Sequence, residues 1–403
     1  MDTDRATLVR QALDRYGNQA LVCRLPEHVV MLTGYQPVLG NTFCLVSRAG
    51  DSVEVRLVAP ADEEDRIPRD CATEIRTYVE ETLDKISTTV PAARKPLAEE
   101  ITSARLGGGA VIAYEGDRSP VAPAYTQVGF PGVSTIDLLH DVLPAAELQP
   151  ATQMLDELAS VKTAAELEHI RQAESVALAG FHAARAAIQP GATEADVAAA
   201  AQSAIIRAGY TSAPAGHVLV YVHVMAGARA ADAYKAYNLT GGNQIERGAT
   251  VSVQMEVGID GYWAELTRSF FVGSVDEAWS RVHGACVRAQ DAALAIIRDG
   301  VAGQEVDEAA RSVLRGAGFG KEFKHGLGHG FGFQAINHAA EPILHPVSQS
   351  ILRAGMVHNM EPAVYRPGVG GFRLNDNVAV RPDGYELLSS GLPRDLDWLV
   401  VDW

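Results

Sequence analysis

Two alternating apolar runs joined by one turn are the feature that most constrains the fold of this chain. Every second residue of the first run is apolar, which is the period of a half-buried strand: Val251, Val253, Met255 and Val257. Asp260-Gly261 follows this run, and that dipeptide is a strong signal for a two-residue β-hairpin loop. The sequence therefore predicts a β-hairpin at about residues 251–268.

The loop also predicts which side chains share a face of the hairpin. Counting back along both strands from Asp260-Gly261 places Glu265 opposite Glu256. Gln254 then lies on the same face as Glu265, on a diagonal of about 7–8 Å between backbones. The two side chains are predicted to converge on one ligand. The alternative is a solvated polar face on which Glu265 is an ordinary surface charge.

Three later segments carry four side chains typical of catalytic sites. The glycine-rich segment 325–332 holds His325 and His329, and glycine lets backbone approach a ligand closely. Glu361 precedes Pro362, whose ring favours an extended backbone before it. Arg373 either pairs with Glu361 or binds a substrate carboxylate bidentately. The alternative is that Glu361 is a buried structural acid and the histidines are structural.

Together these segments resemble the motifs of the pita-bread hydrolases, the family of methionine aminopeptidase, prolidase, aminopeptidase P and creatinase. Residues 253–268 resemble the first metal-binding hairpin, 325–332 and 355–362 the next two motifs, and 370–376 the last. The resemblance implies an α/β chain with a creatinase-type N-terminal α/β domain over residues 1–150 and a pita-bread catalytic domain over 151–403.

The metal ligands of that family are only partly present. The metallopeptidase pattern is Asp, Asp, His, Glu, Glu, and the matching positions here are Gln254, Glu265, His329, Glu361 and Asn375. Two neighbouring divalent cations need several anionic ligands to offset their repulsion, and two neutral amides supply none. No cofactor is therefore expected. The alternative is a single divalent metal (Mn, Zn, Co or Fe) on Glu265, His329 and Glu361.

Two further positions depend on the resemblance. Tyr237 stands where creatinase carries a catalytic histidine, unless His223 or His217 takes over from a neighbouring strand. A tyrosine with a pKa near 10 is a poor base at neutral pH. Family members often carry another histidine seven residues after the His329 position. His338 lies two residues beyond that point and is either its equivalent or a loop residue.

The favoured function is a metal-independent, creatinase-like hydrolase, or a lyase-type enzyme, acting on a C–N bond of a small amino-acid-like or cationic molecule. Its catalytic residues are expected to be His329, Glu265, Glu361, His325, His338 and Tyr237. Its substrate-binding residues are expected to be Gln254, Arg373, Asn375 and His223. One alternative is a metal-dependent, proline-specific aminopeptidase or dipeptidase with a reduced metal site. Another is a non-catalytic binding protein on the same fold.

Composition narrows the possible partners and the compartment. The net charge of −16 argues against nucleic acid, because phosphate binding needs clustered Lys and Arg. The sequence has no run of about 18 apolar residues, so no membrane-spanning helix is expected. Four scattered cysteines without CxxC spacing are typical of reduced thiols in the cytoplasm. A cytoplasmic homodimer acting on a small molecule is expected.

Local patterns predict several elements outside the motifs. Strands are expected over residues 20–23, 42–46, 53–58 and 110–114, and helices over 78–85 and 155–172. Thr193 and Asp196 form an approximate capping box, which predicts that a helix begins there.

Overall fold

Two compact units make up the protein in the computed structural model, which describes residues 1–39, 41–116, 132–213, 216–235 and 239–403. Within these ranges, unit 1 contains the residues up to Ala159 and unit 2 runs from Ser160 to Trp403. The division falls a little after the boundary expected at residue 150. The described part of the chain has no helix that is both long and apolar enough to cross a membrane.

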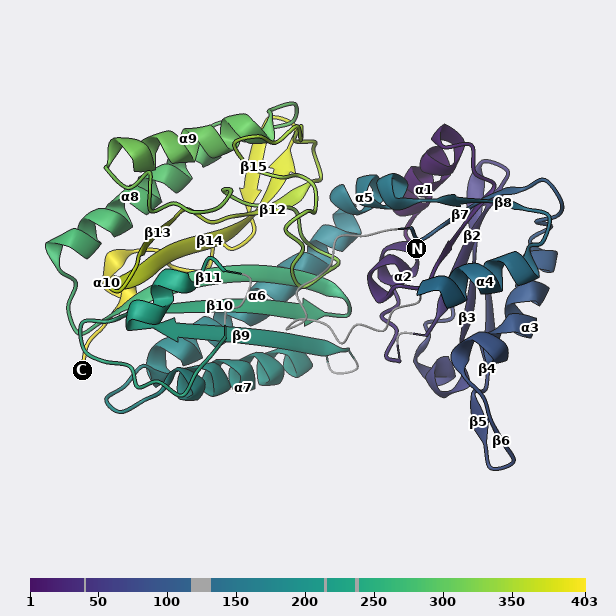
Figure 1. The fold of residues 1–403 in the computed structure, drawn as a ribbon, viewed down its shortest axis with the longest axis horizontal. Coiled ribbons are helices and arrows are strands. Elements are labelled where there is room, and N and C mark those ends of the chain that lie inside the picture. The colour runs from purple at the N-terminus through teal and green to yellow at the C-terminus, as the bar shows by residue number, and fades with distance from the viewer. Residues whose placement is uncertain (40, 117–131, 214–215, 236–238) are drawn as a thin grey trace. The chain divides into compact units, whose positions relative to one another are not determined.

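Unit 1 is built on a mixed sheet with the strand order β4-β3-β2-β1-β7-β8 (Figure 1). Its strands are β1 (Ala20–Cys23), β2 (Phe43–Ala49), β3 (Ser52–Pro60), β4 (Glu74–Tyr78), β7 (Val111–Tyr114) and β8 (Glu147–Pro150), and a separate small hairpin pairs β5 (Glu81–Thr82) with β6 (Lys85–Ile86). Its helices are α1 (Thr3–Arg15), α2 (Pro26–Thr33), η1 (Ala61–Arg66), α3 (Thr89–Ser103), α4 (Gly132–Val142) and α5 (Thr152–Ser160).

The unit 1 core lies between this sheet and the helices α3 and α4. Phe43 and Leu45 of the sheet pack in one buried cluster with Leu97 of α3 and Leu138 of α4. The four strands expected in this region are confirmed. The helix expected over 78–85 is wrong, because β4, β5 and β6 occupy that stretch. An eight-residue window is too short for helical periodicity to be told from a hairpin.

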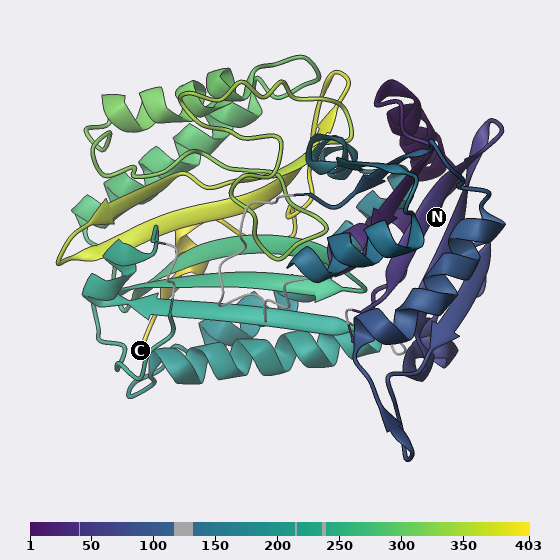
Figure 2. The same cartoon turned by 45° about the vertical axis from the view of Figure 1, so that its right-hand side comes forward.

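Unit 2 is built on a larger sheet with the main order β12-β14-β11-β10-β9 (Figures 1 and 2). Its strands are β9 (Val218–Ala226), β10 (Thr250–Ile259), β11 (Tyr262–Val272), β12 (Val357–Met360), β13 (Ala363–Arg366), β14 (Gly370–Arg381), β15 (Gly384–Leu387) and β16 (Val400–Val401). Its helices are α6 (Ala164–Ala187), α7 (Glu194–Ser212), η2 (Gly227–Asp232), α8 (Glu277–Leu294), α9 (Gly303–Gly316) and α10 (Leu396–Leu399).

Capping boxes set the starts of the two helices that support this sheet. The Thr193 side chain accepts from Asp196 N–H and Asp196 accepts from Thr193 N–H, which confirms the predicted start of α7. Thr163 and Glu166 form the same box at α6. The single helix expected over 155–172 is therefore wrong. The chain breaks between α5 and α6, where Lys162 N–H donates to the Gly355 carbonyl at 2.8 Å.

The hairpin β10–β11 has the predicted loop and register. Asp260 and Gly261 both adopt positive φ, 50° and 84°, as a two-residue hairpin loop requires. Glu256 lies directly opposite Glu265. The residues that alternate with them, such as Val253 and Met255, are buried in the core that includes α6 and α7. The opposite face of the hairpin is therefore left for polar side chains.

Candidate active site

Strand alternation gathers polar side chains in rows on one face of the unit 2 sheet. One row crosses from β9 to β14 through His223, Gln254, Thr267 and Asn375. The next row holds Tyr221, Glu256 and Glu265. Because side chains two residues apart share a face, both rows lie on the same side of the sheet. Gln254 and Glu265 are diagonal neighbours, as the sequence predicts.

Glu265, His329 and Glu361 form a buried group in which the ligand-type atoms all lie within 4.8 Å of one another. His329 Nε2 lies 3.6 Å from Glu265 Oε2 and 3.9 Å from Glu361 Oε1. Backbone pairing brings the segments together, since Asn359 N–H donates to the His329 carbonyl at 3.0 Å and Glu361 N–H to Leu327 at 2.8 Å. This close pairing needs glycine at 328, where a Cβ would lie 2.2 Å from the Asn359 carbonyl oxygen.

Asn359 orients two members of this group. Its Oδ1 accepts from His329 N–H at 2.7 Å, and its Nδ2 lies 3.1 Å from His329 Nε2 and 3.4 Å from Glu361 Oε1. His329 Nδ1 lies 3.0 Å from the Gly330 carbonyl oxygen, which can only accept a hydrogen bond. This contact places the ring proton on Nδ1 and leaves the lone pair on Nε2. His329 thus presents a ligand atom toward both carboxylates.

Arg373 and Gln254 connect the group to a third carboxylate. Arg373 Nη1 lies 3.4 Å from Glu361 Oε2, and Arg373 Nη2 donates to Gln254 Oε1. Gln254 Nε2 in turn donates to Glu256 Oε1 at 2.6 Å. The guanidinium therefore lies beside Gln254, one of the two amides at metal-ligand positions. Arg373 pairs with Glu361, as one of the two sequence alternatives proposed.

Burial dominates the electrostatics of these groups. It raises the pKa of Glu265 and of Glu361 to about 7, although Arg373 opposes the rise in both cases. Burial and the neighbouring Glu265 raise the pKa of Glu256 well above its ordinary value. Burial lowers the pKa of His329. The protein thus holds carboxyl groups where ionisation is costly unless a cation is near.

Several buried polar atoms on this face have no hydrogen-bond partner among the described residues. These atoms are Glu256 Oε2, Glu265 Oε2, Thr267 Oγ1, and Oδ1 and Nδ2 of Asn375. Buried polar atoms in folded proteins are nearly always hydrogen-bonded or bound to a ligand. The oxygens and the His329 nitrogen are of the kinds that borderline divalent metals bind. The residues present therefore fit one divalent ion near Glu265, His329 and Glu361.

The other predicted residues differ in how closely they approach this group. The His338 ring packs edge-on against His329 with centroids 5.0 Å apart, and burial lowers its pKa to about 4. His325 Nδ1 lies 2.7 Å from the Gly326 carbonyl oxygen, and His325 Nε2 lies 3.0 Å from the Tyr365 hydroxyl. His223 Nε2 lies 3.6 Å from Glu256 Oε2. Tyr237 lies outside the described residues.

Glu256 and Asn359 are site residues that the sequence hypotheses did not include. The strand period offered a signal for Glu256, because it lies two residues from Gln254 and directly opposite Glu265. No comparable signal marks Asn359, whose role depends on pairing between segments 30 residues apart in the sequence. The hairpin register therefore contained enough information to include Glu256 in the site, although the sequence hypotheses did not use it.

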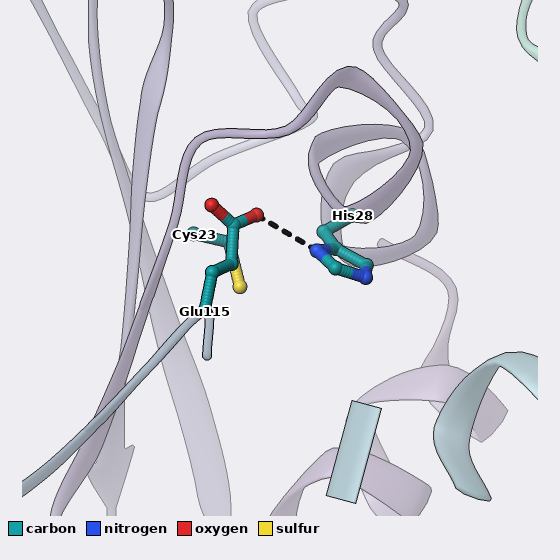
Figure 3. A group of neighbouring side chains, drawn as sticks. All are labelled: Cys23, His28 and Glu115. Atoms are coloured by element: carbon teal, nitrogen blue, oxygen red, sulfur yellow. Dashed lines mark hydrogen bonds and ion pairs between the residues drawn. The ribbon is translucent and has the colours of Figure 1, made fainter. Parts of the chain in front are cut away.

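A second group of metal-type side chains lies in unit 1 (Figure 3). Cys23 at the end of β1, His28 on α2 and Glu115 after β7 place ligand-type atoms within 4.8 Å of one another. Glu115 Oε1 already accepts from Leu25 N–H at 2.8 Å and contacts His28 Nδ1 at 2.7 Å. Burial raises the pKa of the Cys23 thiol well above its usual range. This group is explained by its contacts to the start of α2.

Comparisons with known proteins agree with the motif resemblance. Residues 168–382 match the profile described as Metallopeptidase family M24. The protein named "Probable dipeptidase PepE" of Mycobacterium tuberculosis H37Rv is 33% identical over 288 residues, covering 70% of this chain and 69% of that protein. The Xaa-Pro dipeptidase of Pyrococcus furiosus is 28% identical over 243 residues, covering 60% of this chain and 67% of that protein.

Solved structures of similar fold cover nearly the whole chain. Dipeptidase PepE from Mycobacterium ulcerans matches with a TM-score of 0.74 and 26% identity, over 99% of this chain and 97% of that one. The X-Pro aminopeptidase from Thermotoga maritima matches with a TM-score of 0.78 and 22% identity, over 97% and 100%. The expected α/β architecture with a pita-bread domain is confirmed.

These relationships also bear on the choice between the sequence-based hypotheses. They favour the metal-dependent peptidase over the metal-independent, creatinase-like hydrolase, and they count against the expectation that no metal is used. The prediction of a hydrolase is confirmed, because the matching family is one of metallopeptidases. A sequence profile that spans more than half of the chain and a relative at 33% identity establish the conclusion: the chain belongs to metallopeptidase family M24.

Proposed function

We propose that this protein is a dipeptidase that works with one divalent metal ion. Glu265, His329 and Glu361 would hold the ion, and Arg373 supplies a fixed positive charge on the Gln254 side of the site. The observation that carries the proposal is the buried group of two carboxylates and one imidazole with an oxygen left unpartnered. A bound divalent ion supplies a Lewis acid that polarises a peptide carbonyl.

The balance of charge supports one ion in preference to two. Glu256, Glu265 and Glu361 carry three negative charges when ionised, and Arg373 carries one positive charge that contacts Glu361. The resulting two negative charges are balanced by a single divalent ion. A second ion would leave two positive charges uncompensated in a buried site, where charge is costly.

The protein's own side chains have separate tasks in this proposal. Arg373 and Asn359 fix the two oxygens of Glu361, through contacts of 3.4 Å each. His338 is neutral at neutral pH because its pKa is lowered to about 4, and it packs against His329. We assign His338 to hydrogen bonding or proton transfer at the departing amine. The named activities of the M24 relatives support a dipeptide as substrate.

The test is metal-dependent hydrolysis of a dipeptide panel that includes Xaa-Pro members. Protein stripped with a chelator and reloaded with Mn, Co or Zn should hydrolyse at least one dipeptide, and the Glu361→Gln variant should lose both metal and activity. The matched control is Glu174→Gln, since Glu174 is also buried with an unpartnered oxygen but bonds to Asn377. Hydrolysis that persists in the metal-stripped protein would overturn the proposal.

A further inference from the structure

Glu256 is a buried carboxylate that is not among the proposed metal ligands, although its charge lies close to them. Its side chain is fully buried, and its Oε1 accepts from Gln254 Nε2 at 2.6 Å. Its Oε2 has no hydrogen-bond donor among the residues that the structure describes. Leaving a buried charged oxygen without a donor is costly. The arrangement is therefore suited to a ligand that brings a positive charge or a hydrogen-bond donor.

The wall beside Glu256 is aromatic and apolar. Tyr221 is its neighbour across the strands, and the Tyr221 ring stacks on Trp263 with centroids 6.0 Å apart. Trp263 and Tyr221 belong to a small apolar cluster completed by Leu219, Ala335 and Ile336. Aromatic rings stabilise cations electrostatically, and apolar side chains accept an apolar substituent. A carboxylate with such a wall suits an ammonium group attached to an apolar side chain.

The strand β9 lies beside Glu256 and carries partly exposed side chains. In the strand order of unit 2, β9 ends the main path of the sheet, and Tyr221 and His223 on β9 are partly exposed. His223 Nε2 lies 3.6 Å from Glu256 Oε2, so the oxygen with no donor faces the β9 side of the row.

Gln254 explains why Glu256 is available to a ligand. The amide accepts from Arg373 with its oxygen and donates to Glu256 with its nitrogen. A carboxylate at this position would offer no donor and would repel Glu256. The amide instead orients Glu256 and leaves its second oxygen for an external partner. Position 254 thus carries an amide in place of the family's carboxylate, and this amide holds the carboxylate at position 256.

We propose that Glu256 binds the N-terminal ammonium of the substrate, and that Tyr221 and Trp263 contact an apolar first side chain. The assignment of the ammonium to a dipeptide rests on the proposed function. A dipeptide is a zwitterion, so it adds no net charge to the balanced site. Glu256 is then a specificity-determining residue that distinguishes a free N-terminus from a blocked one.

The test compares two ligands that differ only in the ammonium group. L-leucine and isocaproate have the same carbon skeleton, and no peptidase hydrolyses either one. Calorimetry on the metal-loaded protein should show that leucine binds at least about 10-fold more tightly than isocaproate. A charged hydrogen bond usually changes the affinity by about this factor. The Glu256→Gln variant should lose about 10-fold for leucine and less than about twofold for isocaproate.

Three controls make the result decisive. Glu174→Gln removes a buried carboxylate that bonds to Asn377, and it should leave both affinities unchanged. Metal content of Glu256→Gln, checked by elemental analysis, should equal that of the parent, and Glu256→Asp should keep part of the preference for leucine. Loss of metal in Glu256→Gln would show that Glu256 is a metal ligand and would overturn the proposal. Equal losses for both ligands would also overturn it. Because neither ligand is hydrolysed, these outcomes are independent of whether the protein cleaves dipeptides.

Discussion

Two groups of metal-type side chains lie in different units. They differ in whether their carboxylate oxygens have hydrogen-bond partners within the protein. In unit 1 the Glu115 carboxylate receives Leu25 N–H and contacts His28. In unit 2 Glu265 and Glu256 each keep one buried oxygen without a hydrogen-bond partner among the described residues. In both groups the ligand-type atoms lie within 4.8 Å of one another. Metal-type side chains that lie close together are therefore not enough to identify a binding site. Buried polar atoms that lack hydrogen-bond partners are the better sign.

The largest expected effect follows from removing a ligand of the unit 2 group. Glu265→Gln or Glu361→Gln should lower the affinity for Mn or Zn by at least about 100-fold, because even residues that only support metal ligands are worth 10–100-fold. Competition with a fluorescent chelator measures the affinity. The unit 1 variant Cys23→Ser should bind metal as the parent does. If Cys23→Ser lost metal instead, the assignment of the two groups would be reversed.

A second change tests the link between Gln254 and Glu256. Gln254→Glu removes the donor to Glu256 and adds a like charge, so the free energy of unfolding should fall by about 1–3 kcal/mol. Urea unfolding measures this loss, which should shrink in acid, where the carboxyl groups take up protons. Asn375→Asp is a useful comparison, because Asn375 makes no hydrogen bond to Glu256. A gain of a second metal equivalent in Gln254→Glu would show that Arg373 leaves room for another ion.

A third prediction concerns pH and the metal-free protein. The pKa of Glu265 and of Glu361 is raised from 4.5 to about 7, so these groups hold protons more tightly in the folded state than in the unfolded one. Their contribution to stability is complete below 4.5 and is lost as the pH rises to about 7. The rise in Tm on adding Mn should therefore be larger at about pH 8 than at about pH 5. Thermal unfolding with and without chelator tests this, and an equal rise at both values would contradict it.

The smallest expected effect lies in unit 1. Glu115→Gln weakens the contacts to Leu25 N–H and His28 at the start of α2, and should lower stability by about 1 kcal/mol. Denaturant unfolding measures the change, with metal content and dipeptide hydrolysis unchanged. A change in metal content would mean that the Cys23, His28 and Glu115 group also binds an ion.

The sequence was enough to predict the parts of the site that depend on local pattern. The Asp260-Gly261 loop determines the register, so the pairing of Glu256 with Glu265 followed directly. The role of Arg373 was left open between two partners, because strand period says nothing about which neighbour a long side chain contacts. Asn359 was not predicted, since its bond to His329 spans two segments distant in sequence.

Charge compensation explains why the metal hypothesis changed. Counting ligands one by one suggested a damaged site, because Gln254 and Asn375 are neutral. The structure adds Glu256 to the anions and places Arg373 beside Gln254. In the proposed function, one divalent ion would balance the charges of Glu256, Glu265, Glu361 and Arg373. Cytoplasmic location and a homodimer remain predictions.

Metal stoichiometry tests the central claim most directly. Protein purified in the presence of Mn, Co or Zn, then dialysed, can be analysed by elemental analysis together with native mass spectrometry of the parent and of the double variant Glu265→Gln with Glu361→Gln. One equivalent of divalent metal per chain in the parent, absent from the double variant, is the result that this account predicts. Two tightly held equivalents in the parent, or an equivalent retained by the double variant, would contradict it.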